Sequence, residues 1–466
     1  MSGQRRPSPV PARTRGGLNV SAGTALCVGA VLGPGALTLA STAAAAAGPA
    51  SVLAWFGLVA VSLPIAVVFA ALGSRHPDGG GVAAFVRLAF GPAAAAPVGW
   101  WFFWAVPLGV PAAALIGGEY VAAAAGWGRG GALVTALLVL AAAYGANLAG
   151  LRLSGRLQLL MVGLLVLLLT VTIAVTTSHV RSDRFRPFLP HGWSSVGSAA
   201  GVLFFAFAGW EAISHLSADF ETPGRDVVRA TLRAWGVVAV LYLGLALVTI
   251  GVLGPRAGTT TTPLTALLEH GIGALARPVT AGAAVLLTFG AVNAYLAGAA
   301  RLGAALADEG VLPRRLAAGS AATGAAPRRS LTLLAVVSAA VTLASAFGAI
   351  GLDTLLRATS SCLVAVTLGG LLAATVLLPR RGLLRAGALA ASAVIGVVLV
   401  FCGPYLLIPV VLAAAAHIFR TVKGPPTDPG RPGLDRSSRR NRSLPPRSVR
   451  GVAGPSRWGT APRPLR

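Results

Sequence analysis

The chain has 466 residues, of which 55% are hydrophobic and only 11% are charged, whereas charged residues make up about a quarter of an ordinary soluble domain. This composition excludes a soluble globular protein. The formal net charge of +25 comes almost entirely from arginine. These arginines lie in short connections and tails, as is typical of segments that flank membrane helices on the cytoplasmic side. We therefore expect a membrane protein and no nucleic-acid partner.

Apolar runs close to the ~20 residues that a bilayer core requires recur along the chain. They predict an all-α membrane protein with 12 transmembrane helices inside a membrane domain over 18–420. The predicted spans lie near 19–44, 49–73, 95–124, 131–150, 157–177, 196–219, 231–253, 275–300, 330–349, 354–378, 386–402 and 404–420. Residues 1–17 are predicted to form a basic cytoplasmic tail, and 421–466 a disordered basic cytoplasmic tail.

The placement of arginine predicts the orientation of the chain in the cytoplasmic membrane. If the N-terminus is cytoplasmic, most of the loop arginines, such as Arg75, Arg87 and Arg301, fall on the inner side. The cluster at 181–186 is the exception. The bias places both termini in the cytoplasm.

The first predicted span contains a helix breaker, because VGAVLGPGALTLA (28–40) has Gly33, Pro34 and Gly35 at its centre. A break leaves backbone N–H and C=O groups without helical partners. In hydrocarbon each such group costs several kcal/mol. The break is therefore expected to be buried in protein or to line a watery cavity.

The sixth predicted span supplies a second break in GVLFFAFAGWEAISHLSADFETPGRDVVRAT (201–231), where Gly209 is followed by the ionisable Glu211. Broken helices at corresponding positions in two halves point to an inverted-repeat transporter. Spans one to five (about 18–178) and six to ten (about 196–378) would be the two repeats. The helices over 386–420 would be additional.

Two such breaks suit a zwitterionic substrate. The helix that begins after Gly35 offers free N–H groups and a positive dipole end to a carboxylate. Carbonyl groups around Val31–Gly33 and Ala206–Ala208 can accept from an ammonium group. The predicted substrate site therefore comprises Val31, Leu32, Gly33, Pro34, Gly35, Phe205, Ala206, Phe207, Ala208, Gly209 and Trp210.

Three further polar residues stand out in the apolar segments. Glu211 is an acid at membrane depth, which makes it a candidate for proton coupling or substrate binding, or a structural tie to a neighbouring helix. Asn293 can hydrogen-bond across helices or line the path, and the first is favoured. Glu119 is predicted to be interfacial. Apart from Glu211, no acid lies near the mid-depth of either broken helix, which argues against a dibasic or polyamine substrate.

No cofactor and no metal site are expected. Cys27, Cys362 and Cys402 lie in apolar segments without metal-like spacing. An integral membrane enzyme would need converging nucleophiles, bases or carboxylates, and the intramembrane ionisable residues are too scattered for that. A transport-like sensor is the other class considered, but the tail is too short and polar for a signalling domain.

Three stretches, 64–91, 99–118 and 209–231, resemble the amino acid–polyamine–organocation (APC) superfamily, and within it the bacterial exporters of L-methionine and branched-chain amino acids. The resemblance implies a 5+5 inverted-repeat (LeuT-like) core with discontinuous helices 1 and 6, and export of methionine, leucine, isoleucine or valine by proton antiport. It also places Phe205 at an aromatic gating position. A proton-coupled importer of similar substrates is the alternative. Pro34 departs from the family pattern and removes one N–H donor.

Overall fold

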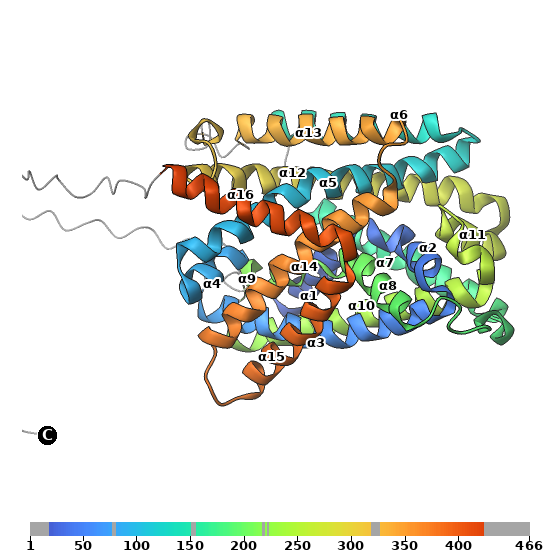
Figure 1. Cartoon of the computed structure of the whole chain (residues 1–466). Helices are drawn as coiled ribbons and strands as arrows, with labels where there is room; N and C mark the ends of the chain where they lie inside the picture. Colours follow the sequence, from blue (N-terminus) through green and yellow to red (C-terminus); the bar gives the residue numbers. More distant parts are fainter. Residues whose placement is uncertain are drawn as a thin grey trace, which may run out of the picture. The chain divides into compact units, whose positions relative to one another are not determined.

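The computed structural model describes residues 18–76, 81–150, 155–216, 220, 223–317 and 327–423. Apart from short turns, these residues are helical, which confirms the all-α class (Figure 1). The α-helices are α1 (Val20–Val31), α2 (Gly35–Ala47), α3 (Ser51–Arg75), α4 (Gly81–Phe90), α5 (Pro92–Ala125), α6 (Arg129–Leu148), α7 (Gly155–Thr176), α8 (Trp193–Phe207), α9 (Ile213–Leu216), α10 (Pro223–Leu253), α11 (Pro263–Ile272), α12 (Ala276–Asp308), α13 (Arg328–Ala346), α14 (Leu352–Leu377), α15 (Leu383–Phe401) and α16 (Leu407–Lys423).

Eleven helical segments in the described residues are long and apolar enough to cross a bilayer. One of them combines α2 and α3, and α1 is too short to be counted by itself. Each predicted span is mostly helical where the structure describes it. The protein is therefore a multi-pass membrane protein.

The predicted first span is two helices, because α1 ends at Val31 and α2 begins at Gly35. The predicted sixth span is also interrupted. There α8 ends at Phe207, and a 3₁₀ turn, η4 (Trp210–Ala212), leads into the short helix α9. Both helix breaks that the glycines predict are thus present.

The helices pack closely because many of the residues between them are small. Fully buried alanines are found on most of the long helices, and small residues at helix interfaces let membrane helices approach one another. The long helix α5 contacts α6, α12, α14 and α16, so it runs through the middle of the described bundle (Figure 1).

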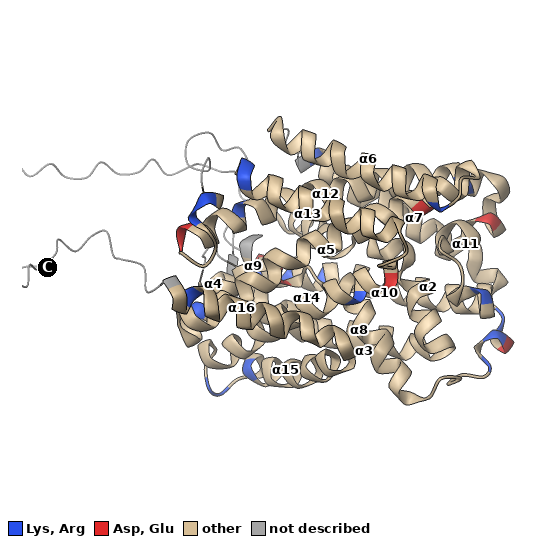
Figure 2. Ribbon diagram, turned by 45° about the horizontal axis from the view of Figure 1, so that its top comes forward, with Lys and Arg blue, Asp and Glu red and all other residues tan. Residues whose placement is uncertain are grey.

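The short helix α4 lies between α3 and α5 in the chain. Arg87 of α4 forms an ion pair with Glu309, which follows α12. Figure 2 shows that lysine and arginine gather mainly at the end of the bundle near α4, while its long middle carries few charges. The loops predicted from the sequence are likewise rich in arginine.

Candidate functional site

The break between α1 and α2 exposes backbone donors next to a helix N-terminus. Leu32 is extended, and Ala36 and Leu37 donate to the carbonyls of Gly33 and Pro34 at 3.1 and 3.0 Å. The N–H groups of Gly33 and Gly35 have no acceptor within the described ranges. A Cβ atom built on Gly33 would meet no heavy atom within 4 Å. Two donors thus lie at the positive end of α2, and the one on Gly33 borders open space.

At the second break, a side-chain carboxylate accepts a hydrogen bond from the backbone. Gly209 has φ 131°, and its N–H donates to Oε2 of Glu211 at 3.0 Å. The hydroxyl of Ser214 donates to the Glu211 carbonyl oxygen at 2.6 Å. Glu211 is buried, at 9% exposure. The structure therefore places the predicted acid inside the break, where the N–H of Gly209 orients it.

The two breaks lie against each other. A Cβ atom built on Gly209 would lie 2.2 Å from the carbonyl oxygen of Ala30 and 3.2 Å from Cα of Val31. No side chain fits at that distance, and φ at Gly209 is in a region that residues with a Cβ rarely adopt. Glycine at this position lets the backbone of η4 touch the end of α1.

Tyr242 of α10 joins the two breaks and was not singled out by the sequence analysis. Its hydroxyl lies 3.2 Å from the carbonyl oxygen of Val31 and 3.0 Å from that of Ala206. Both carbonyls stand at helix ends, where they have lost their own N–H donors. The tyrosine is completely buried. The sequence signal for this role was a single phenol inside the apolar run 234–253, because polar groups at membrane depth usually have a partner.

The predicted aromatic residues have different surroundings. Phe207 packs against Trp55 and Tyr242, with ring centroids 5.9 and 5.4 Å away. Trp210 is buried, and its indole N–H has no acceptor among the residues described. Phe205 is only partly buried, and its Cδ1 would lie 3.1 Å from a Cβ on Gly35. Of these residues, Phe205 faces the N-terminus of α2.

One side of α2 is covered by α11 and the segment before it. The hydroxyl of Tyr120 donates to the carbonyl oxygen of Leu37 at 2.6 Å and accepts from the N–H of Leu264 at 3.3 Å. Ser41 donates to the carbonyl oxygen of Thr260 at 2.5 Å. These contacts hold α11 and its preceding turn against α2.

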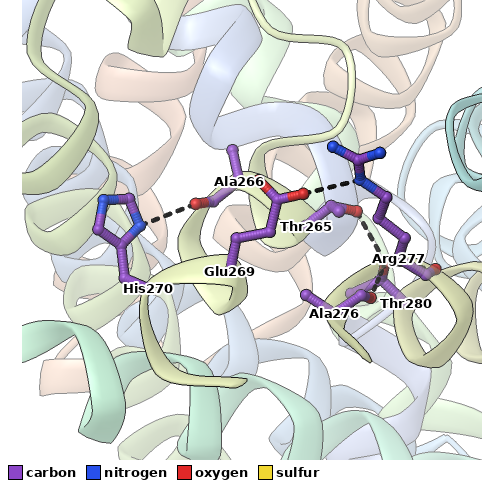
Figure 3. Close-up of polar contacts among 7 residues, drawn as sticks. All are labelled: Thr265, Ala266, Glu269, His270, Ala276, Arg277 and Thr280. Atoms are coloured by element: carbon purple, nitrogen blue, oxygen red, sulfur yellow. Dashed lines mark hydrogen bonds and ion pairs between the residues drawn. The ribbon is translucent and has the colours of Figure 1, made fainter. Parts of the chain in front are cut away.

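The helix α11 is in turn fixed to the start of α12 (Figure 3). The hydroxyls of Thr265 and Thr280 lie 2.7 Å apart, and Arg277 donates to Glu269 at 2.9 Å. Both pairs connect α11 with α12. The helix α11 is therefore held in place at α12 as well as at α2.

Asn293 and Glu119 lie apart from the two breaks. Asn293 of α12 accepts from the side-chain amide of Asn147 of α6 at 2.7 Å, and both residues are buried. The predicted interhelical hydrogen bond is therefore present. Glu119, near the end of α5, lines a small hollow of about 50 Å³ with Arg129 and Ser345.

Comparison with known proteins identifies the family. The sequence model of the amino acid permease family matches residues 18–419. The chain is 38% identical over 405 residues to the uncharacterized amino acid permease YecA of Bacillus subtilis, which covers 86% of this chain and 95% of that protein. It is 32% identical over 291 residues to the L-methionine/branched-chain amino acid exporter YjeH of Escherichia coli, which covers 61% of this chain and 68% of that protein. A match of 28% over 249 residues, 49% of this chain and 53% of the relative, links it to the branched-chain amino acid permease BcaP of Bacillus subtilis. The chain therefore belongs to the amino acid permease family of the APC superfamily.

Proposed function

We propose that the protein is a secondary active transporter of neutral apolar L-amino acids, namely methionine, leucine, isoleucine and valine, and that it exports them in exchange for protons. It would lie in the cytoplasmic membrane with both termini inside. Its twelve spans would form a 5+5 inverted-repeat core with two additional helices. Alternating access would then involve movement of the two broken helices against the rest of the bundle.

The observation that carries this proposal is the contact between the two helix breaks. On one side, Gly33 and Gly35 offer backbone N–H groups at the positive end of α2. On the other, the carbonyl groups of Val31 and Ala206 end two half-helices and share the hydroxyl of Tyr242. The N–H donors suit a carboxylate, and the carbonyl acceptors suit an ammonium group. Together the two breaks therefore fit the carboxylate and ammonium groups of a free amino acid.

The surroundings favour an apolar substrate side chain. Phe205 is partly exposed and faces Gly35, while Leu32 lies at the break itself. Glu211 is the one acid within the described part of the two breaks, and its carboxylate already accepts from Gly209. A dibasic or polyamine substrate would need more negative partners than this single acid provides. Glu211 is our proposed proton-coupling residue because it is buried beside the site.

Outward transport is proposed from the similarity to YjeH, whose name describes an exporter of methionine and branched-chain amino acids. Similarity to BcaP, named as a branched-chain amino acid permease, supports the same substrate class. An importer of the same substrates is the alternative, and one experiment distinguishes the two directions.

The test measures efflux of amino acids from cells preloaded with dipeptides that contain methionine or leucine. Cells expressing the wild type should release methionine and leucine faster than cells with an empty vector. Gly35→Trp should abolish the difference, because the new side chain would collide with Phe205 and Leu39. Gly282→Trp is the matched control, since a Cβ at that exposed position meets no heavy atom within 4 Å.

The same preloaded cells test direction and substrate class. Wild-type efflux equal to that of empty cells, with accumulation of external leucine, would identify an importer. No flux of any neutral amino acid in either direction, in cells or in reconstituted vesicles, would overturn the proposed function.

A further inference from the structure

An apolar groove lies between α6, α12 and α13, on helices that take no part in the two breaks. It has a volume of about 390 Å³, within the range of small-molecule pockets. Leu296 of α12 lines it together with residues of α6 and α13. The other lining residues are Leu137, Leu140, Ala141, Tyr144, Thr332, Ala335, Val336 and Ala339.

One end of this groove is polar. The hydroxyls of Tyr144 and Thr332 lie 3.0 Å apart, and Thr332 also donates to the carbonyl oxygen of Arg328 at 2.8 Å. These are the groove's polar side chains, and every other lining residue is aliphatic. The groove therefore has the amphipathic character of a site that meets the edge of a bilayer.

A basic cluster stands one helical turn beyond the polar end. Arg328 and Arg329 are exposed at the start of α13, and Arg329 donates to the carbonyl oxygen of Arg315 at 3.3 Å, which places the exposed Arg314 and Arg315 alongside. Arg301 is exposed on α12, five residues after Leu296.

Two acids lie at the end of α12. Glu309 is already paired with Arg87, and Asp308 lies two turns beyond Arg301. The arginines outnumber these acids, so the polar end of the groove attracts anions.

We propose that this groove binds an anionic phospholipid, with an acyl chain between α6 and α13 and the phosphate at Arg328 and Arg329. Charge complementarity supports this occupant, since basic pockets between membrane helices on the cytoplasmic side hold anionic head groups. Arginine matches phosphate oxygens through two parallel N–H donors. In the orientation proposed above, the cluster lies in the inner leaflet. The lipid site itself does not depend on the transported substrate.

The size of the groove favours a lipid chain over a helix from a second copy. Thr332 and Ala339 are seven residues apart, so the groove is about 10 Å long at 1.5 Å per helical residue. A groove of this length offers only about two turns of contact to a helix about 10 Å wide. An extended acyl chain is much thinner.

The experiment is native mass spectrometry of the full-length protein in detergent, titrated with phosphatidylglycerol or phosphatidylcholine that carry identical acyl chains. The wild type should retain one phosphatidylglycerol at least tenfold more tightly than phosphatidylcholine. Val336→Trp should fill the groove and reduce retention of both lipids at least tenfold. Residue 336 is 61% exposed on the outer surface of α13, so the larger side chain has room there. Ala339→Leu is a second groove-filling variant.

Charge is tested separately from shape. The double change Arg328→Gln and Arg329→Gln should remove the preference for phosphatidylglycerol while leaving phosphatidylcholine retention unchanged. Val394→Trp on the exposed face of α15, and the double change Arg380→Gln and Arg381→Gln, are the matched controls and should behave as wild type. Equal lipid retention by wild type and both groove-filling variants would overturn the proposal. So would a lipid-free dimer that Val336→Trp converts to a monomer.

Discussion

Replacement of Gly209 by alanine tests the contact between the two helix breaks directly. The added Cβ would lie 2.2 Å from the oxygen and 2.8 Å from the carbon of the Ala30 carbonyl. Both are backbone atoms, so no side chain can rotate away. The end of α1 must withdraw by about 1 Å to restore van der Waals contact, in an interior that is close-packed.

The cost of this substitution follows from two terms. A residue other than glycine at φ 131° loses about 1–3 kcal/mol from backbone strain. Overpacking adds about 1–3 kcal/mol, for a total of about 2–6 kcal/mol. At about 1.4 kcal/mol for each factor of ten, even the lower limit corresponds to roughly a 30-fold fall in the equilibrium constant between the native contact and states in which it is broken.

The assay is leucine and methionine transport in proteoliposomes, combined with thermal unfolding of the same preparation in detergent. Gly209→Ala should lower both kcat/KM and Tm. Gly236→Ala on α10 is the matched control, since its Cβ would meet no heavy atom within 4 Å. Gly33→Ala should retain the wild-type Tm for the same reason, although its methyl group would project into the proposed site. Wild-type transport and Tm in Gly209→Ala would refute the contact on which the proposed function rests.

Three further predictions concern polar groups inside the bundle. Tyr242→Phe leaves the carbonyls of Val31 and Ala206 without this donor, at a cost of about 1–3 kcal/mol to the geometry of the two breaks. Both Tm in detergent and kcat/KM in proteoliposomes should fall, and unchanged transport would show that the phenol does not position the site. Glu211→Gln should preserve folding and make transport insensitive to an imposed pH gradient, and a wild-type response to that gradient would exclude Glu211 as the coupling residue. Asn147→Leu removes a hydrogen bond between α6 and α12 worth about 1 kcal/mol, so Tm in detergent should fall while the substrate profile is retained; an unchanged Tm would contradict this assignment.

Both helix breaks were predictable because their signals are local. Gly33, Pro34 and Gly35 disfavour a helix by themselves, and the structure ends α1 directly before them. At the second break, Gly209 adopts φ 131°, as a glycine placed before an intramembrane acid suggested. Local sequence was sufficient at these positions because backbone preference and the need to satisfy freed polar groups act together.

The partners of these breaks were not predictable, because they come from distant parts of the chain. Tyr242 reaches Val31 across 211 positions and Ala206 across 36. The interhelical role of Asn293 could be anticipated from its depth, but its partner Asn147 depends on how α6 packs against α12. A sequence shows which groups need partners, whereas the tertiary fold decides which partners they obtain.

The helix α11 was missed for a different reason. Its ten residues, which include Thr265, Glu269 and His270, are too few for a span, so no span was predicted between 253 and 275. Pro263 at its first turn and Gly273 at its end are ordinary helix boundary signals. Both signals are present in the sequence, but they bound a helix that is shorter than a membrane span.

The interruption between α1 and α2 also limits cooperativity within the first span. In the described structure the helical ladder stops where Leu32 donates to Val28, and it restarts where Ala36 donates to Gly33. The two halves have different main neighbours, since α1 packs mostly on α10, whereas α2 packs mostly on α8. Hydrogen exchange should therefore proceed at different rates in α1 and α2, with each half opening as a separate unit. A membrane helix divided in this way can loosen at one face of the bilayer while its other half keeps every backbone hydrogen bond.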